Sequence, residues 1–121
     1  MRKETANILS ILDGYSLPSA EEIGKLIAAD FRSRRVEKGY TREEIASRAD
    51  VPPSNVARFE QKGLISLTNL IKLAMALDYT SELKGIFSEP KFSTMEELTQ
   101  IRKNAGKKKV YPKRNSDDEK D

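Results

Sequence analysis

The chain has 121 residues, of which 34% are charged, and a formal net charge of +3, as expected for one small domain with short extensions. It has no cysteine and no histidine, which excludes zinc sites built on those ligands and nucleophilic sites built on Cys or on Ser–His pairs. No apolar run reaches 18 residues, and no titratable cluster or phosphate-binding loop is visible. We therefore expect no membrane span, no metal, no cofactor and no enzymatic activity.

The first 18 residues predict an N-terminal helical extension, because residues 4–13 form a short amphipathic stretch. A long helix then starts at Ser19, which forms an S-x-x-E capping box with Glu22. Gly39 is expected to end this helix. Its apolar stripe has the spacing i, i+4, i+8 and consists of Ile23, Ile27 and Phe31.

Residues 41–63 predict two short helices joined by a tight turn. The first begins with a T-x-x-E capping box, Thr41 to Glu44, and its inward stripe is Ile45, Ala46 and Ala49. Pro52 forces the preceding Val51 into extended geometry, which ends this helix.

Pro53 suits the first position of the second helix, where the missing N–H costs nothing. Val56 and Phe59 are spaced i, i+3 and predict the buried face. Gly63 is the expected left-handed terminator. The side chains left on the outer face are Ser54, Asn55, Ala57 and Arg58.

Two further core helices follow the helix pair. Ser66 caps the first, whose wide apolar face should be largely buried. That face consists of Leu67, Leu70, Ile71, Ala74 and Leu77. Thr80 and Ser81 start a shorter helix, with Leu83, Ile86 and Phe87 available to the core.

A linker covers residues 88–93, after which Ser93 and Glu96 predict a third S-x-x-E box and a helix that ends at Gly106. We expect residues 107–121 to be a disordered tail, basic and then acidic. The basic stretch 107–114 fits a solvated tail, an arm that binds phosphate, or a segment that binds a partner protein.

Residues 41–63 resemble the phage-repressor (Cro/cI, Xre-type) helix-turn-helix family, and the likeness extends over residues 20–88. The matching positions are Thr41, Glu43, Glu44, Ile45, Ala46, Ala49, Val51, Val56, Glu60 and Gly63. Three positions depart from the family pattern: Arg42 replaces a Gln that touches phosphate, Asp50 replaces the turn Gly, and Pro52 replaces a Ser N-cap.

The resemblance implies an all-α, five-helix bundle at residues 19–88. The residue pattern after it predicts a linker and C-terminal helix at 89–106. The resemblance also implies an ion pair between Arg35 and Glu60 that ties the long helix to the second helix of the pair. For DNA, we expect base contacts from Pro53, Ser54, Ala57 and Arg58. We expect phosphate contacts from Arg42, Asn55, Lys62 and Arg48.

These features predict a sequence-specific DNA-binding transcriptional regulator, a repressor that acts as a homodimer on a palindromic operator in double-stranded DNA. We expect it in the cytoplasm, associated with the nucleoid. Residues 66–83, the Pro-containing linker and the basic tail also resemble antitoxins paired with HipA-type kinase toxins. The alternative is an adaptor or coactivator that uses the same helical fold to bind protein; the outward Arg42 and Arg58 favour DNA.

Overall fold

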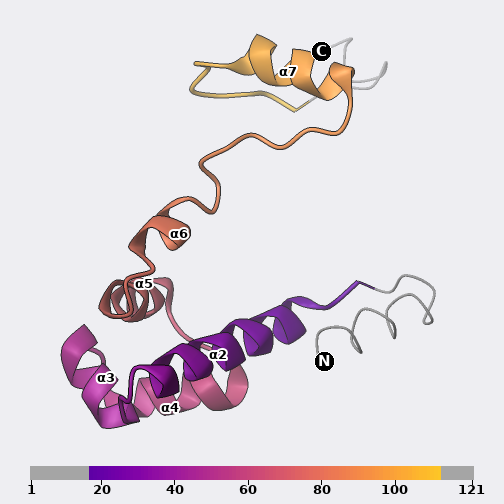
Figure 1. Cartoon of the computed structure of the whole chain (residues 1–121). Coiled ribbons are helices and arrows are strands. Elements are labelled where there is room, and N and C mark those ends of the chain that lie inside the picture. The colour runs from indigo at the N-terminus through magenta and orange to yellow at the C-terminus, as the bar shows by residue number, and fades with distance from the viewer. Residues whose placement is uncertain (1–16, 113–121) are drawn as a thin grey trace. The chain divides into compact units, whose positions relative to one another are not determined.

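A computed structural model describes residues 17–112, in which six α-helices and no strand occur (Figure 1). This confirms the predicted all-α fold. The predicted amphipathic stretch 4–13 and the acidic end lie outside the described residues. The helices are α2 (Ala20–Glu37), α3 (Arg42–Ala49), α4 (Pro53–Lys62), α5 (Leu67–Ala76), α6 (Thr80–Lys84) and α7 (Met95–Asn104).

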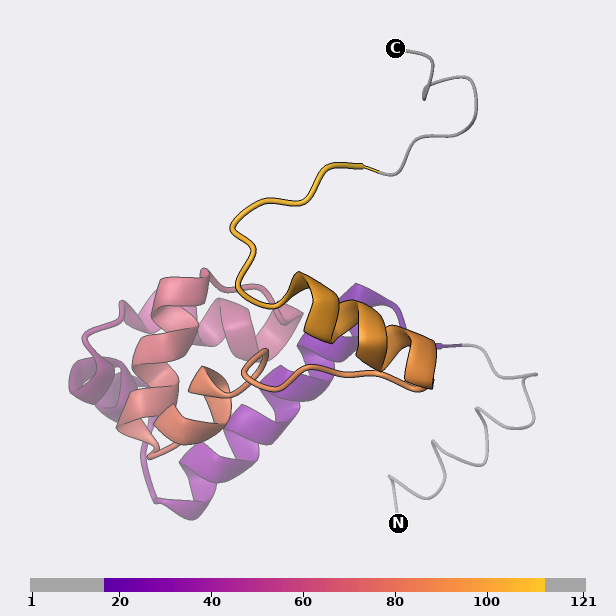
Figure 2. The same cartoon turned by 90° about the horizontal axis from the view of Figure 1, so that it is seen from above.

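The described residues up to Lys84 belong to one compact unit and those from Gly85 onward to a second. The first unit holds α2 to α6, which Figure 2 shows from a second direction, and the second holds α7. Within residues 17–112, no helix combines the length and apolar character needed to cross a membrane.

Side-chain capping boxes fix where α2 and α3 begin. In the capping box of α2, the Glu22 backbone N–H donates to Ser19 Oγ at 3.1 Å, and the Ser19 N–H donates back to Glu22 Oε1 at 3.4 Å. Thr41 and Glu44 form the same reciprocal pair before α3, at 3.0 and 3.2 Å. Each box satisfies two backbone donors that a helix start leaves open, so both predicted boxes are confirmed.

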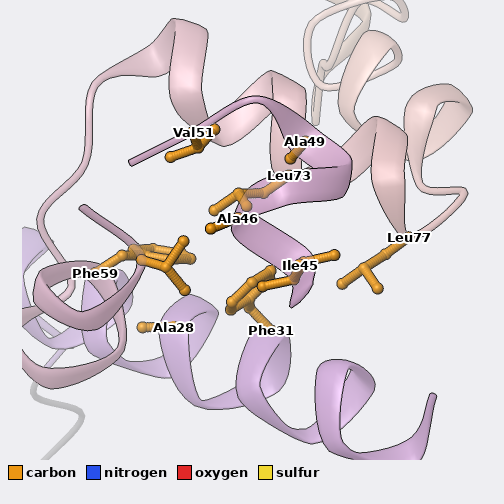
Figure 3. Packing of buried hydrophobic residues seen from close by; sticks show 10 residues of the cluster. Ala28, Phe31, Ile45, Ala46, Ala49, Val51, Phe59, Leu73 and Leu77 are labelled. Carbon is orange, nitrogen blue, oxygen red and sulfur yellow. The ribbon is translucent and has the colours of Figure 1, made fainter. Parts of the chain in front are cut away.

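The core lies between α2, α3, α4 and α5 (Figure 3). Its aromatic centre is the tilted pair Phe31 and Phe59, with ring centroids 5.3 Å apart. Each large side chain buried here contributes about 1.5–3 kcal/mol relative to exposure. The buried apolar residues are Ala28, Phe31, Ile45, Ala46, Ala49, Val51, Val56, Phe59, Leu73 and Leu77.

The predicted stripe on α2 is correct at Phe31 and wrong at the two isoleucines, since Ile23 is 45% and Ile27 46% exposed. The reason is that this part of α2 approaches α4 at the small residue Gly24. A Cβ placed on Gly24 would lie only 2.9 Å from the Gly63 carbonyl oxygen. The side of α2 that meets the core therefore follows the line of Gly24, and its buried residues are Ala28, Phe31 and Arg35.

The prediction that the apolar face of α5 is largely buried is correct for Leu77, correct in part for the half-buried Leu70 and Ala74, and wrong for the rest. Leu73 and Leu77 are buried, whereas Leu67 is 68% exposed and Ile71 and Met75 are exposed as well. A helix face loses contact with water only where another element covers it, and α5 packs against α3 and the five-residue α6. Beyond α6, Ile86 and Phe87 are exposed, contrary to the prediction.

In the second unit, α7 begins one residue later than the predicted capping box. Thr94 is the N-cap, and its Oγ1 accepts the Glu97 N–H at 3.1 Å. Ser93 instead donates both its N–H and its hydroxyl to the Glu97 carboxylate, at 3.2 and 3.0 Å. The predicted Ser93–Glu96 box is therefore wrong, because adjacent Ser and Thr, each followed three residues later by Glu, allow either register.

Candidate nucleic-acid interface

The turn between α3 and α4 is anchored by one buried side chain and one left-handed residue. Val51 is buried and its N–H donates to the Ala46 carbonyl at 3.0 Å. Asp50, the C-cap of α3, has φ 56° and ψ 51°, a left-handed conformation that glycine adopts most easily. Lys72 of α5 reaches across to donate to the Asp50 carbonyl at 3.3 Å. The turn is thereby held by the buried Val51 side chain and by the hydrogen bond from α5.

Helix α4 starts at Pro53 without a side-chain cap, since its N-cap is Pro52. Val56 and Phe59 are buried in the core and fix the rotation of the helix about its axis. Gly63 ends it with φ 70°, and the Gly63 N–H donates to the Phe59 carbonyl at 2.7 Å. Both the N1 proline and the glycine terminator were predicted from the sequence.

This rotation sets the outer face of α4. Pro53, Ser54 and Arg58 are exposed, while Asn55 and Ala57 are half-buried. Arg58 forms no ion pair with the residues that the structure describes. The face thus combines small polar groups near the start of the helix with one arginine a turn later, which suits hydrogen bonding to base edges.

Arg35 and Glu60 form a bidentate ion pair between α2 and α4. Arg35 Nε lies 2.6 Å from Glu60 Oε2, and Arg35 Nη2 lies 3.0 Å from Glu60 Oε1. Arg35 Nη1 also donates to the Tyr40 carbonyl at 2.7 Å, which fixes the loop before α3. The Glu60 side chain is only 1% exposed, so the pair is shielded from water.

Arg42, the first residue of α3, shares the same carboxylate: its Nε donates to Glu60 Oε1 at 2.9 Å. Burial is the largest single influence on Glu60 and raises its pKa. The hydrogen bonds and charges of Arg35 and Arg42 together outweigh it, so the pKa of Glu60 lies below its ordinary value. The sequence analysis did not predict the contact between Arg42 and Glu60. The one feature that could have indicated it is that a carboxylate has two acceptor oxygens, whereas only Arg35 was predicted to bind Glu60.

The other candidate phosphate contacts differ in how firmly they are held. The Arg48 guanidinium lies over the Tyr40 ring, 4.4 Å from its centroid, a cation–π contact at the end of α3. Lys62 is exposed in the last turn of α4.

Residues 17–112 contain no group of three or more acidic side chains that could hold a metal ion.

Comparison with known proteins agrees with this geometry. Residues 31–83 match the sequence pattern of a family described as helix-turn-helix. The match begins in the second half of α2 and ends in α6, so it contains the turn, the outer face of α4 and the Arg35–Glu60–Arg42 group. No curated protein matches the chain.

Proposed function

We propose that this chain, whose residues 31–83 form a helix-turn-helix domain of the Xre/Cro/cI type, is a transcriptional repressor that binds a specific DNA sequence. The domain supports a DNA-binding regulator; repression and the residues that act are our proposal. The observation that carries it is the outer face of α4, which is polar, holds a cation without an ion-pair partner among the described residues and projects from a rigid turn.

In this proposal α4 lies in the major groove, with its N-terminal half toward the bases. Pro53, Ser54, Ala57 and Arg58 contact base edges, with Arg58 placed to donate to guanine O6 and N7. Arg42, Asn55, Arg48 and Lys62 contact phosphates and fix the register of the domain on the duplex. Pro53, one of the base contacts, is the first residue of α4. Arg42 and Lys62, two of the phosphate contacts, are the first residue of α3 and the last residue of α4.

We further propose that the protein acts as a homodimer on a palindromic operator. Helix α4 has 10 residues, which corresponds to about 15 Å of helix and can read only a few base pairs. Two copies related by a two-fold axis would double the contacts and require half-sites about 10–10.5 bp apart.

The antitoxin role expected from residues 66–83 is a narrower proposal within the same function. Its test is co-expression of this chain with the product of the neighbouring gene, followed by purification of the complex. A stable complex with a kinase-type protein supports the antitoxin role. A monogenic locus, or a neighbour that does not bind, leaves the autonomous repressor.

The main test is selection of bound duplexes from a random-sequence DNA pool by the full-length chain. We expect an enriched motif with two-fold symmetric half-sites, and repression of a reporter gene that carries this motif in its promoter. A pool without enrichment would overturn sequence-specific binding and would favour the protein-binding adaptor instead.

A further inference from the structure

Glu60 accepts three hydrogen bonds from two arginines. Arg35 Nε donates to Oε2 at 2.6 Å. Arg35 Nη2 and Arg42 Nε both donate to Oε1, at 3.0 and 2.9 Å. The bidentate Arg35 pair alone already balances the carboxylate charge and joins α2 to α4. The third hydrogen bond, from Arg42, is therefore not needed to join α2 to α4. Its effect is to fix the direction of the Arg42 side chain.

The net charge of the Arg35–Glu60–Arg42 group also indicates a role for Arg42 beyond joining the helices. One carboxylate faces two guanidinium groups, which leaves one unit of excess positive charge. Arg35 has a side chain only 9% exposed, whereas that of Arg42 is 35% exposed. Arg42 is held through Nε, on the inner edge of its guanidinium, and Nη1 and Nη2 form no ion pair with other described residues. The more exposed of the two guanidinium side chains is thus that of Arg42.

From this geometry we infer that Glu60 is a positioning residue for DNA binding: it holds Arg42 by Nε so that both Nη groups face a DNA phosphate. The inference rests on the proposed function and deepens it. A guanidinium fixed in advance loses less conformational freedom when it binds than a freely rotating one. It also offers phosphate two donors in a planar fork, which a lysine in the same place cannot do.

A purely structural role for Arg42 makes different predictions. If Arg42 only completes the ion-pair cluster, its replacement changes stability and leaves DNA binding alone. If its charge acts without a fixed direction, Glu60→Gln strengthens its contribution to DNA binding, because a nearby negative charge is removed. The positioning role predicts the opposite sign, namely that Arg42 contributes less to DNA binding once Glu60 is replaced.

The first measurement is made without DNA. In the side-chain ¹⁵N spectrum of the full-length protein, the Arg42 Nε–H should give a sharp signal protected from exchange with water. This signal, assigned by its loss in Arg42→Ala, should disappear in Glu60→Gln. An Arg42 Nε–H that exchanges freely in the wild-type protein would overturn the inference, whatever the protein binds.

The second measurement is the salt dependence of binding to a short random-sequence duplex. Arg42→Ala should lower the slope of log affinity against log salt by about 0.9 in the wild-type background, as expected for one phosphate contact. In the Glu60→Gln background the same substitution should change the slope by less than about half of that value. Lys62→Ala is the control: Lys62 has no contact with Glu60, so its effect should be equal in both backgrounds.

Circular dichroism verifies that Glu60→Gln is folded. If it is not, Arg42→Lys replaces it, since this change keeps the charge and leaves Glu60 and Arg35 intact. We then expect Arg42→Lys to lose most of the affinity that Arg42→Ala loses, and full recovery by lysine would overturn the positioning role. Equal effects of Arg42→Ala in both backgrounds would overturn it too, with the proposed function intact. A wild-type protein that binds no duplex at low salt would overturn the function itself.

Discussion

Gly24 of α2 and Gly63, the C-cap of α4, bring two backbones into direct contact. A Cβ on Gly24 would lie 2.9 Å from the Gly63 carbonyl oxygen, and a Cβ on Gly63 would lie 2.7 Å from the Gly24 carbonyl carbon. Gly63 also has φ 70°, so side chains are unfavourable there for a second reason. This close approach fixes α4 against α2 and so helps to set which face of α4 points outward.

Gly24→Ala tests this contact by the sign of its effect. In the middle of an exposed helix, replacing Gly by Ala stabilises by about 1 kcal/mol through helix propensity. Here the clash with the Gly63 backbone should reverse the sign and destabilise by about 1–3 kcal/mol. Urea unfolding measures the difference, and Ser33→Ala on the exposed side of α2 is the propensity control, with no loss expected. A more stable Gly24→Ala protein would contradict the observed packing.

The Arg35–Glu60 pair should dominate the ionic contribution to stability. Glu60→Ala leaves the buried Arg35 without its partner and should cost about 3–5 kcal/mol in the free energy of unfolding. A double-mutant cycle with Arg35 measures the coupling. The control cycle is the exposed pair Arg34 and Glu37 on α2, 2.8 Å apart, for which we expect a coupling of at most about 0.5 kcal/mol. Similar couplings in the two cycles would speak against a special role of the buried pair.

The lowered pKa of Glu60 predicts a particular pH dependence. Because the folded state holds the carboxylate charged, its contribution is fully present above the ordinary pKa of a glutamate in the unfolded chain. That contribution is lost as the pH falls through the lower pKa of the folded state. The difference in unfolding free energy between the wild type and Glu60→Gln should therefore be constant near neutral pH and shrink in acid. A difference that grows on acidification would show that the folded pKa is raised instead.

The uneven burial of α5 predicts unequal effects of two identical substitutions. Leu73 is fully buried, so Leu73→Ala should cost about 2–5 kcal/mol. Leu67 lies on the same helix but is largely exposed, so Leu67→Ala should cost less than about 1 kcal/mol in the monomer. Chemical denaturation at low protein concentration checks both. A large loss for Leu67→Ala under these conditions would mean that its face is covered in solution.

For DNA recognition, Arg58→Ala should cost about 1–3 kcal/mol on the selected motif and relax the preference at one base position. The expected cause is the loss of a bidentate contact with a guanine edge. Affinities for the motif and for random duplex are compared at the same salt concentration. Equal losses on both would assign Arg58 to the phosphates and not to the bases.

Local signals in the sequence predicted much of this molecule. Signals that depend on residues a few positions apart can be recognised without tertiary structure. They include the capping boxes at Ser19 and Thr41, the N1 proline of α4 and its glycine terminator. The core residues of α3 and α4 were predicted for the same reason: in these short helices the larger apolar residues Ile45, Val56 and Phe59 fall on one face.

Contacts between distant segments were harder to predict. The sequence alone determined the helix pair, its turn and the buried face of α4, because those depend on spacing within 23 residues, 41–63. Only the tertiary structure decided that Gly24 rather than Ile23 marks the inner line of α2, that half of the α5 face stays exposed, and that Arg42 shares the carboxylate of Glu60. The physical reason is that helical periodicity reveals which side chains share a face, whereas burial and ion pairing depend on which other element covers that face.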